Sequence, residues 1–365
     1  MKIPTPFLSR ALLAVAFALA LLPSRPGLAE AQTGQTHSVA NDGPHVMWNG
    51  DSPDVYWRKG DKFVVAHFKG APFDLPLPEI APMTLRLDGK PYAEPVSELP
   101  EPPQIFAISD VHGRFDTMRD LLVANKVVDG QYRWTFGKGH LVVLGDVVDR
   151  GQQVTECLWF IRALEDGAKA AGGRVHMLLG NHEAMLMTGD YRYANPKYLK
   201  YPDGMPGLPQ HFGPQSELGR WLRSRPLILK IGNTLFVHGG ISPEFLAEGL
   251  DTETANKRLS AELSPEGDGS STFLLGPGGP LWYRGMVLDG REDSISDSDL
   301  TRILAHMKVK RVAVGHTTME SVRALHGGKV LAVDSGIQHG RAEGLFIAKG
   351  KAYRALADGS KVAIE

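Results

Sequence analysis

Two apolar stretches that run directly into turns rich in Asp and His decide the fold. They read QIFAISDVHG (104–113) and LVVLGDVVDRG (141–151). Each contains four consecutive apolar residues, a run that fits a strand covered on both faces. Helical periodicity follows each stretch, at 115–124 and 154–171. The alternation of strand and helix predicts a layered α/β domain.

The same arrangement recurs further along the chain. Predicted strands at 175–179, 234–237 and 312–314 each run into a turn, and further strands are expected at 227–231 and 330–333. A helix is expected near 296–306. The late strands lie close together in sequence, which predicts sheets of mixed direction. The three turns read Gly180-Asn181-His182-Glu183, His238-Gly239-Gly240 and Gly315-His316.

Five strand ends therefore carry polar side chains of one chemical kind. The carboxyl ends of strands at one edge of a sheet are where α/β proteins gather ligands. Carboxylate, imidazole and amide oxygen suit divalent Mn, Fe or Zn, and the lack of thiolates argues against a closed structural zinc site. The candidate ligands are Asp110, His112, Asp146, Asn181, His238 and His316.

This series of motifs resembles the calcineurin-like metallophosphoesterases. It is most similar to their phosphoprotein phosphatase branch, and within it to the bacterial Shewanella-like protein phosphatases, which include exported tyrosine phosphatases. The resemblance covers roughly residue 103 to the C-terminus. It implies a core of layered mixed β-sheets, a β-sandwich, flanked by helices. Thr318 stands where many superfamily members have a further metal-binding His, as in the phosphoprotein phosphatase branch.

The resemblance also implies a role for each matching residue. Two divalent ions would be held by the six ligands, Asp110 and His112 at the first, Asn181, His238 and His316 at the second, with Asp146 between them. A hydroxide bridging the ions would attack phosphorus in line. His182 would act as the general acid, oriented by Asp149. Arg150 and Arg284 would bind the phosphoryl oxygens, and Asp334 is a candidate partner for a ligating His.

The expected activity is metal-dependent hydrolysis of phosphate monoesters by a protein phosphatase. Phosphotyrosine and phosphoserine or phosphothreonine both stay open as substrates. One alternative is an exported phosphohydrolase of nucleotides or dinucleoside polyphosphates. Another is a non-catalytic metal-binding scaffold, which His182, Asp149, Arg150 and Arg284 disfavour because holding metal does not require them.

The N-terminus is typical of an exported protein. Lys2 and Arg10 precede an apolar run, and Ala29 and Ala31 follow it; this order is typical of a cleavable signal peptide. We therefore expect a signal peptide at 1–31, a linker at 32–45, a small β-rich module at 46–99 and the catalytic domain at 100–365. The expected location is the periplasm or the exterior, without membrane attachment after cleavage.

Composition narrows the choice of partners. The chain has 40 Lys and Arg against 41 Asp and Glu and one Cys. Such a balance, with no basic block, gives no electrostatic reason to expect a nucleic-acid partner. The expected partner is a phosphorylated protein, peptide or small phosphomonoester. The segment 191–212, rich in Tyr and Pro, is either a wall of the substrate pocket or a surface excursion whose rings pack on the domain.

Overall fold

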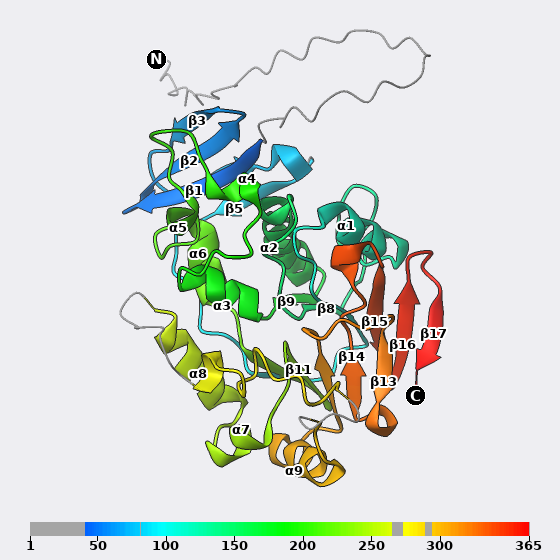
Figure 1. Cartoon of the computed structure of the whole chain (residues 1–365). Coiled ribbons are helices and arrows are strands. Elements are labelled where there is room, and N and C mark those ends of the chain that lie inside the picture. Colours follow the sequence, from blue (N-terminus) through cyan, green and yellow to red (C-terminus); the bar gives the residue numbers. More distant parts are fainter. Residues whose placement is uncertain (1–40, 81, 265–272, 289–293, 365) are drawn as a thin grey trace, which may run out of the picture. The chain divides into compact units, whose positions relative to one another are not determined.

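Two six-stranded sheets form the centre of the computed structural model, which describes residues 41–80, 82–264, 273–288 and 294–364. The predicted signal peptide and most of the predicted linker lie outside these residues. In the first sheet, with order β17-β16-β15-β7-β8-β9, the strands β7, β8 and β9 run parallel and β15 to β17 are antiparallel (Figure 1). The strands are β7 (Gln104–Ile108), β8 (His140–Val143), β9 (Arg174–Met177), β15 (Glu343–Ala348), β16 (Lys351–Leu356) and β17 (Lys361–Ile364).

The second sheet has the order β13-β14-β12-β11-β10-β6 and is also mixed. Strands β11, β12 and β14 are parallel, whereas β10 and β13 are antiparallel to their neighbours β11 and β14. The predicted mixed sheets are thus confirmed. The strands are β6 (Glu98–Leu99), β10 (Ile228–Ile231), β11 (Thr234–Val237), β12 (Arg311–Val314), β13 (Arg323–Leu325) and β14 (Val330–Ala332).

The two sheets pack face to face. Successive side chains of a strand point to opposite faces, so each strand contributes to an inner layer between the sheets and to an outer layer. Ile105 and Ala107 of β7 belong to one apolar cluster with Phe236 of β11, between the sheets. The intervening Phe106 instead joins the cluster on the outer face of the first sheet. Leu235 joins the cluster on the outer face of the second sheet. The result is a sandwich with an apolar layer on either side.

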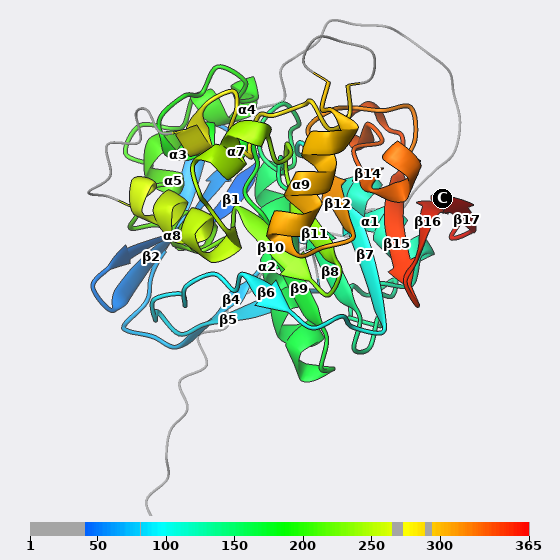
Figure 2. The ribbon, with the colours of Figure 1, turned by 90° about the horizontal axis from the view of Figure 1, so that it is seen from below.

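Helices cover both outer faces. Helices α1 and α2 pack on the first sheet, and α7, α8 and α9 pack on the second (Figure 2). The amphipathic helix α2 buries Trp159 and Phe160 against the first sheet. The α-helices are α1 (Phe115–Ala124), α2 (Val154–Ala170), α3 (Asn181–Met187), α4 (Pro196–Leu199), α5 (Leu208–His211), α6 (Glu217–Arg223), α7 (Pro243–Ala247), α8 (Thr252–Glu262) and α9 (Asp297–Met307). Four short 3₁₀ helices are η1 (Pro78–Ile80), η2 (Phe273–Leu275), η3 (His326–Gly328) and η4 (Ile337–His339).

The N-terminal β-rich segment is joined closely to the rest. Its three-stranded sheet consists of β1 (Asp42–Asn49), β2 (Ser52–Lys59) and β3 (Lys62–His67), and β4 (Phe73–Pro76) pairs with β5 (Thr84–Leu87). Strand β1 begins at Asp42, inside the range expected to be linker. The described residues form one compact unit, in which Trp159 Nε1 donates to Pro44 O at 2.8 Å and Trp48 Nε1 to Glu217 Oε2 at 2.7 Å. The division at 99/100 stays a prediction.

The strand ends expected at one edge of a single sheet come from two sheets instead. The turns after β7, β8 and β9 leave the first sheet, and those after β11 and β12 leave the second. They meet because the sheets face each other with these ends on the same side. None of the described helices is both long and apolar enough to cross a membrane.

Candidate active site

Asp146, in the turn after β8, lies at the centre of the site. Its carboxylate is buried, and Oδ2 lies 3.6 Å from His112 Nε2, 3.2 Å from His238 Nε2 and 3.9 Å from His182 Nε2. One carboxylate thus faces imidazoles from three different turns. This is the placement expected of a ligand shared between two cations.

Two overlapping groups of ligand atoms are compact enough to hold an ion, and Asp146 belongs to both. Their members are His112, Asp146 and His182 in one and Asp146, His238 and His316 in the other. Asn181 Oδ1 lies 2.9 Å from His238 Nε2, beside the second group. His182, predicted as an acid rather than a ligand, is therefore as near to Asp146 as a ligand is.

Asp110 also reaches this centre, although it is in neither group. Its Oδ2 accepts from Ser109 Oγ at 2.5 Å and from the His316 N–H at 2.9 Å. Burial raises the pKa of Asp110 well above its usual range, and the nearby Asp334 carboxylate raises it further. A cation beside Asp110 would counter both effects.

The unpaired imidazole nitrogens test whether these residues fit a metal. His112 Nε2 and His316 Nε2 are buried and have no hydrogen-bond partner among the described residues. Buried polar atoms are rarely left without a partner. Neutral imidazole and carboxylate are a donor set for divalent transition metals. The residues therefore fit a centre for divalent cations.

Backbone carbonyls orient two of these imidazoles. His112 Nδ1 lies 2.8 Å from Val148 O, and His238 Nδ1 lies 2.6 Å from Leu144 O. A proton on Nδ1, donated to the carbonyl, leaves the Nε2 lone pair facing the centre. Asp334, predicted as a partner for a ligating His, accepts from Thr318 Oγ1 at 2.6 Å and from the Gly336 N–H at 2.9 Å.

The histidines differ in charge. Burial lowers the pKa of His112 to about 3. Burial, together with the neighbouring His238, lowers the pKa of His316 to about 2. Burial disfavours charged His238, but the carboxylates of Asp146 and Asp110 and the Leu144 carbonyl together outweigh it and raise the pKa of His238 to about 9. His112 and His316 are thus neutral and ready to coordinate, whereas His238 must lose a proton when a cation binds.

The turns hold strained backbone where the functional side chains sit. Positive φ angles occur at Asp110 (53°), His112 (45°), Asp146 (54°) and His316 (60°), and Asp149 and Arg150 share this conformation. Residues other than Gly seldom adopt it, and such strain concentrates at functional sites.

Glu183 supports that strained turn, a role the sequence did not reveal. Its buried carboxylate accepts from the N–H groups of Asp146, Val147 and Gly180 at 2.8 Å and of Val148 at 3.1 Å. A Glu in the first turn of a helix commonly does no more than favour the helix start. The carboxylate instead ties the turn after β8 to the turn after β9 and so fixes Asp146 against Asn181 and His182.

His182, Asp149 and Arg150 form a second functional cluster. His182 Nδ1 lies 2.6 Å from Asp149 Oδ2, and its Nε2 lies 3.3 Å from Arg150 Nη2. Arg150 Nη1 donates to the side chain of Gln338, a residue with no sequence signal. Asp149 thus orients an imidazole whose other nitrogen faces the arginine.

A pocket of about 210 Å³ joins these clusters and brings both predicted phosphate-binding arginines together. Arg284 donates to His316 O at 2.7 Å. Tyr193 is 46% exposed, its ring centroid lies 5.1 Å from that of His182, and it lines the pocket. Tyr191, two positions before Tyr193, lines a different cavity. The pocket is lined by Asp110, Asp146, Arg150, Asn181, His182, Tyr193, Trp282, Arg284, His316, Thr318 and Gln338.

Comparison with known families agrees with this geometry. Residues 103–319 match the family described as calcineurin-like phosphoesterase. The chain belongs to this family. The matched range includes the turns after β7, β8, β9, β11 and β12, whereas Gln338 lies beyond it. Membership makes the chain a hydrolase of phosphoesters.

Relatives within the calcineurin-like phosphoesterases include protein phosphatases. The chain is 26% identical to Shewanella-like protein phosphatase 2 of Arabidopsis thaliana, over 67% of this chain and 74% of the relative. It is 32% identical to the solved cold-active protein-tyrosine phosphatase of a psychrophilic Shewanella species, with a TM-score of 0.79 over 89% of this chain and 100% of that one. It is also 32% identical to a symmetrical bis(5′-nucleosyl)-tetraphosphatase of Neisseria meningitidis, over 38% of this chain and 44% of the relative.

Proposed function

We propose that the chain is a protein phosphatase that hydrolyses phosphate monoesters of tyrosine, serine or threonine side chains. The observation that carries the proposal is the single pocket in which His182, Arg150 and Arg284 face Asp146. Similarity to a tyrosine phosphatase over 89% of the chain supports it, whereas similarity to tetraphosphatases covers 38% to 54%.

In this proposal two divalent cations are held by the predicted ligands. Asp110, His112 and Asp146 would hold one, and Asp146, Asn181, His238 and His316 the other. Such cations supply Lewis acidity, which polarises a phosphoryl oxygen and lowers the pKa of water toward neutrality. The ligand set suits manganese, iron and zinc alike, and manganese is the ion used in the tests below.

The chain's own side chains complete the reaction. Arg150 and Arg284 approach the pocket with planar guanidinium groups that match phosphoryl oxygens in pairs. His182 would donate its Nε2 proton to the leaving oxygen as the P–O bond breaks. Asp149, 2.6 Å from Nδ1, holds the ring in place and stabilises its protonated form. Gln338 positions Arg150 through their hydrogen bond.

A substrate panel tests the proposal. Protein supplied with manganese would be given phosphotyrosyl and phosphoseryl peptides, p-nitrophenyl phosphate, nucleoside monophosphates and diadenosine tetraphosphate, each at matched concentration. We expect kcat/KM to be highest for phosphopeptides. Preferred cleavage of diadenosine tetraphosphate or nucleotides would replace the proposal with the nucleotide alternative. Folded, metal-loaded protein with no turnover would favour a scaffold.

We also propose that the protein is exported to the periplasm or the exterior, as residues 1–31 suggest. The proposal is supported by their charged, apolar and small-residue order. N-terminal sequencing of the protein recovered from its native host would test it. A mature chain starting near residue 32 is expected, and retention of Met1 or Lys2 in the cell interior would contradict it.

A further inference from the structure

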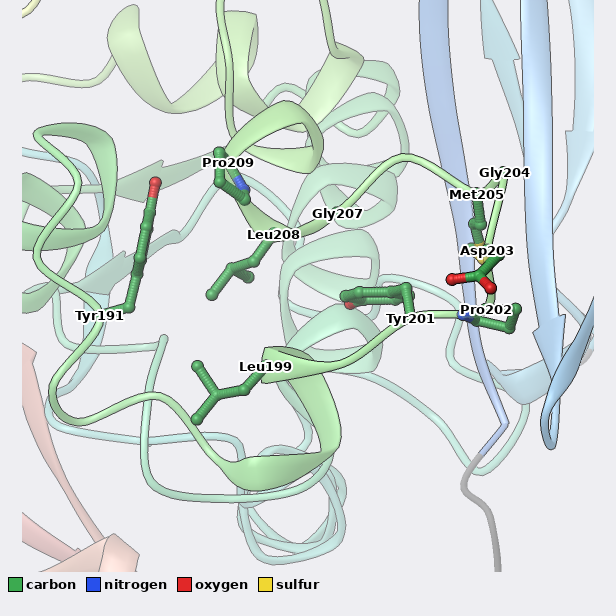
Figure 3. A pocket seen from close by; sticks show the side chains of 10 residues that line it. All are labelled: Tyr191, Leu199, Tyr201, Pro202, Asp203, Gly204, Met205, Gly207, Leu208 and Pro209. Atoms are coloured by element: carbon green, nitrogen blue, oxygen red, sulfur yellow. The ribbon is translucent and has the colours of Figure 1, made fainter.

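A second cavity lies on the segment that follows α3. It measures about 430 Å³, within the range of about 300–1,000 Å³ usual for ligand pockets. Helices α4 and α5 and the chain between them form most of it (Figure 3). It is lined by Tyr191, Leu199, Tyr201, Pro202, Asp203, Gly204, Met205, Gly207, Leu208 and Pro209. None of these residues belongs to the cation centre.

Most of the side chains that line the cavity are apolar or aromatic. Leu199 and Leu208 point toward one another, with Tyr191 on one side and Tyr201 on the other (Figure 3). Leu199 is 57% exposed, the largest exposed fraction among the large apolar side chains of the described residues. A ligand that covers Leu199 would bury apolar surface, which is favourable.

One charged group completes the cavity. The Asp203 carboxylate is exposed and lines the wall, and it has neither an ion pair nor a hydrogen bond with any residue in the described ranges. The chemical complement of the cavity is therefore an apolar side chain with a cation next to it.

The wall opposite the solvent is fixed in place by the N-terminal sheet. Tyr201 Oη donates to Asp42 Oδ2 at 2.8 Å, and its ring meets that of His211 edge-on, with centroids 4.5 Å apart. His211 in turn stacks on His45 at 3.5 Å. These contacts join β1 to the segment between α4 and α5. A cavity with walls held in this way exists before a ligand arrives, which lowers the entropy cost of binding.

The cavity is next to the active-site pocket along the chain. Tyr191 lines the cavity and Tyr193 lines the pocket, separated only by Arg192. The Cα atoms of these two tyrosines are at most about 7 Å apart, since each residue extends the chain by about 3.3–3.6 Å. An extended peptide with its phosphorylated residue in the pocket would reach the cavity with a side chain two or three positions away.

We propose that this cavity is a substrate subsite that binds an apolar side chain, of the size of Leu or Met, two or three positions from the phosphorylated residue. Asp203 favours Lys or Arg adjacent to that side chain. The inference rests on the proposed protein phosphatase function and adds to it the class of peptide that is preferred.

Peptides with leucine moved along the sequence test the subsite. The substrates are phosphotyrosyl nonapeptides of Gly and Ser with one Leu at each position in turn, and p-nitrophenyl phosphate as the substrate without a peptide. We expect one Leu position, two or three residues from phosphotyrosine, to lower KM by about tenfold or more, as burial of such a side chain predicts. A Lys next to that Leu should lower KM further than a Glu there.

Two variants locate the effect. In Leu199→Ser, the ratio of kcat/KM for the best peptide to that for p-nitrophenyl phosphate should fall by about tenfold. The matched control is Val362→Ser on β17, which is 46% exposed and outside the cavity, and its ratio should equal that of the unaltered protein. Asp203→Asn should abolish the preference for Lys over Glu while keeping the preference for Leu.

The possible failures are distinguishable. Equal KM values for all Leu positions, or an unchanged ratio in Leu199→Ser, would overturn the subsite while phosphopeptide hydrolysis itself stands. A protein that hydrolyses p-nitrophenyl phosphate or nucleotides but neither phosphotyrosyl nor phosphoseryl peptides would overturn the proposed function, and the subsite with it.

Discussion

Replacing His182 by Asn tests the proposed general acid. Asn cannot supply a proton, yet it is small enough to fit a space where the imidazole is 3% exposed. The substitution removes the imidazole whose Nδ1 lies 2.6 Å from Asp149 Oδ2. General acids contribute about 10²–10⁴-fold to rate, which corresponds to about 2.7–5.4 kcal/mol of barrier.

The size of the rate decrease should depend on the leaving group. A phenol such as that of tyrosine, with a pKa of about 10, needs protonation as it departs. Nitrophenol forms a far more stable anion and needs it less. We therefore expect His182→Asn to lower kcat/KM by about 10²–10⁴-fold for phenyl phosphate and by much less for p-nitrophenyl phosphate.

The assay compares steady-state kcat/KM for both esters in the unaltered protein, His182→Asn and the control His67→Asn, whose side chain is 72% exposed. Metal content must be measured in each, because His182 Nε2 lies 3.9 Å from Asp146. An equal decrease on both esters at unchanged metal content would refute the acid role. A loss of metal would instead identify His182 as a ligand.

Three further changes test other parts of the site. Arg284→Lys keeps the charge but removes the paired donors. The loss of one charge-assisted hydrogen bond, about 1.5–3 kcal/mol, should lower kcat/KM by about 10- to 100-fold. An unchanged kcat/KM would show that Arg284 does not bind the phosphate. Glu183→Gln keeps one of two acceptor oxygens, each of which accepts from two N–H groups. Two unpaired buried donors should lower the free energy of unfolding, measured in urea, by about 2–6 kcal/mol. A decrease below about 1 kcal/mol, on the order of an ordinary surface change, would contradict the role of Glu183 in holding the two turns together. Burial lowers the pKa of His140 to about 4, and burial together with His140 lowers the pKa of His176 to about 3. In the unfolded chain these imidazoles have a pKa of about 6.5, so below that pH the unfolded state binds more protons than the folded state. Thermal stability should therefore fall as pH drops from 7 to 4, and less so in His176→Asn; an identical fall in the variant and the unaltered protein would exclude the pair as its source.

The strands and helices around the site could be predicted because local sequence determines them strongly. The predicted strand 104–108 and helix 115–124 coincide with β7 and α1. The first is an apolar run followed by Ser109 and Asp110, and the second is a periodic run followed by Asn125. The six candidate ligands follow strands β7, β8, β9, β11 and β12, and they converge because the two sheets face each other with these strand ends on the same side.

The elements that were missed depend on contacts distant in sequence. Strands β15 to β17 include exposed positions, and they are held by pairing with one another and by the pairing of β15 with β7. Asp42 and His45 looked like polar linker residues, but both are buried. Their burial is possible because Asp42 accepts from Thr155 and Tyr201, partners more than 100 positions away.

Dependence on contacts distant in sequence also explains why some residues of the site were not predicted. Gln338 carries no motif, and its role exists only because η4 brings it to Arg150. Glu183 was visible inside a motif, but the four N–H groups that it binds come from two turns. Tyr191 and Tyr193 could not be assigned to different hollows from sequence alone, because they are only two positions apart.

The central claim is that phosphomonoester hydrolysis depends on cations held around Asp146. The most direct measurement follows p-nitrophenyl phosphate turnover in protein stripped of divalent metal, verified by elemental analysis, and then titrated with manganese. We expect turnover to vanish on stripping and to return as about two ions bind per chain. Full turnover by protein with no measurable metal would contradict the account.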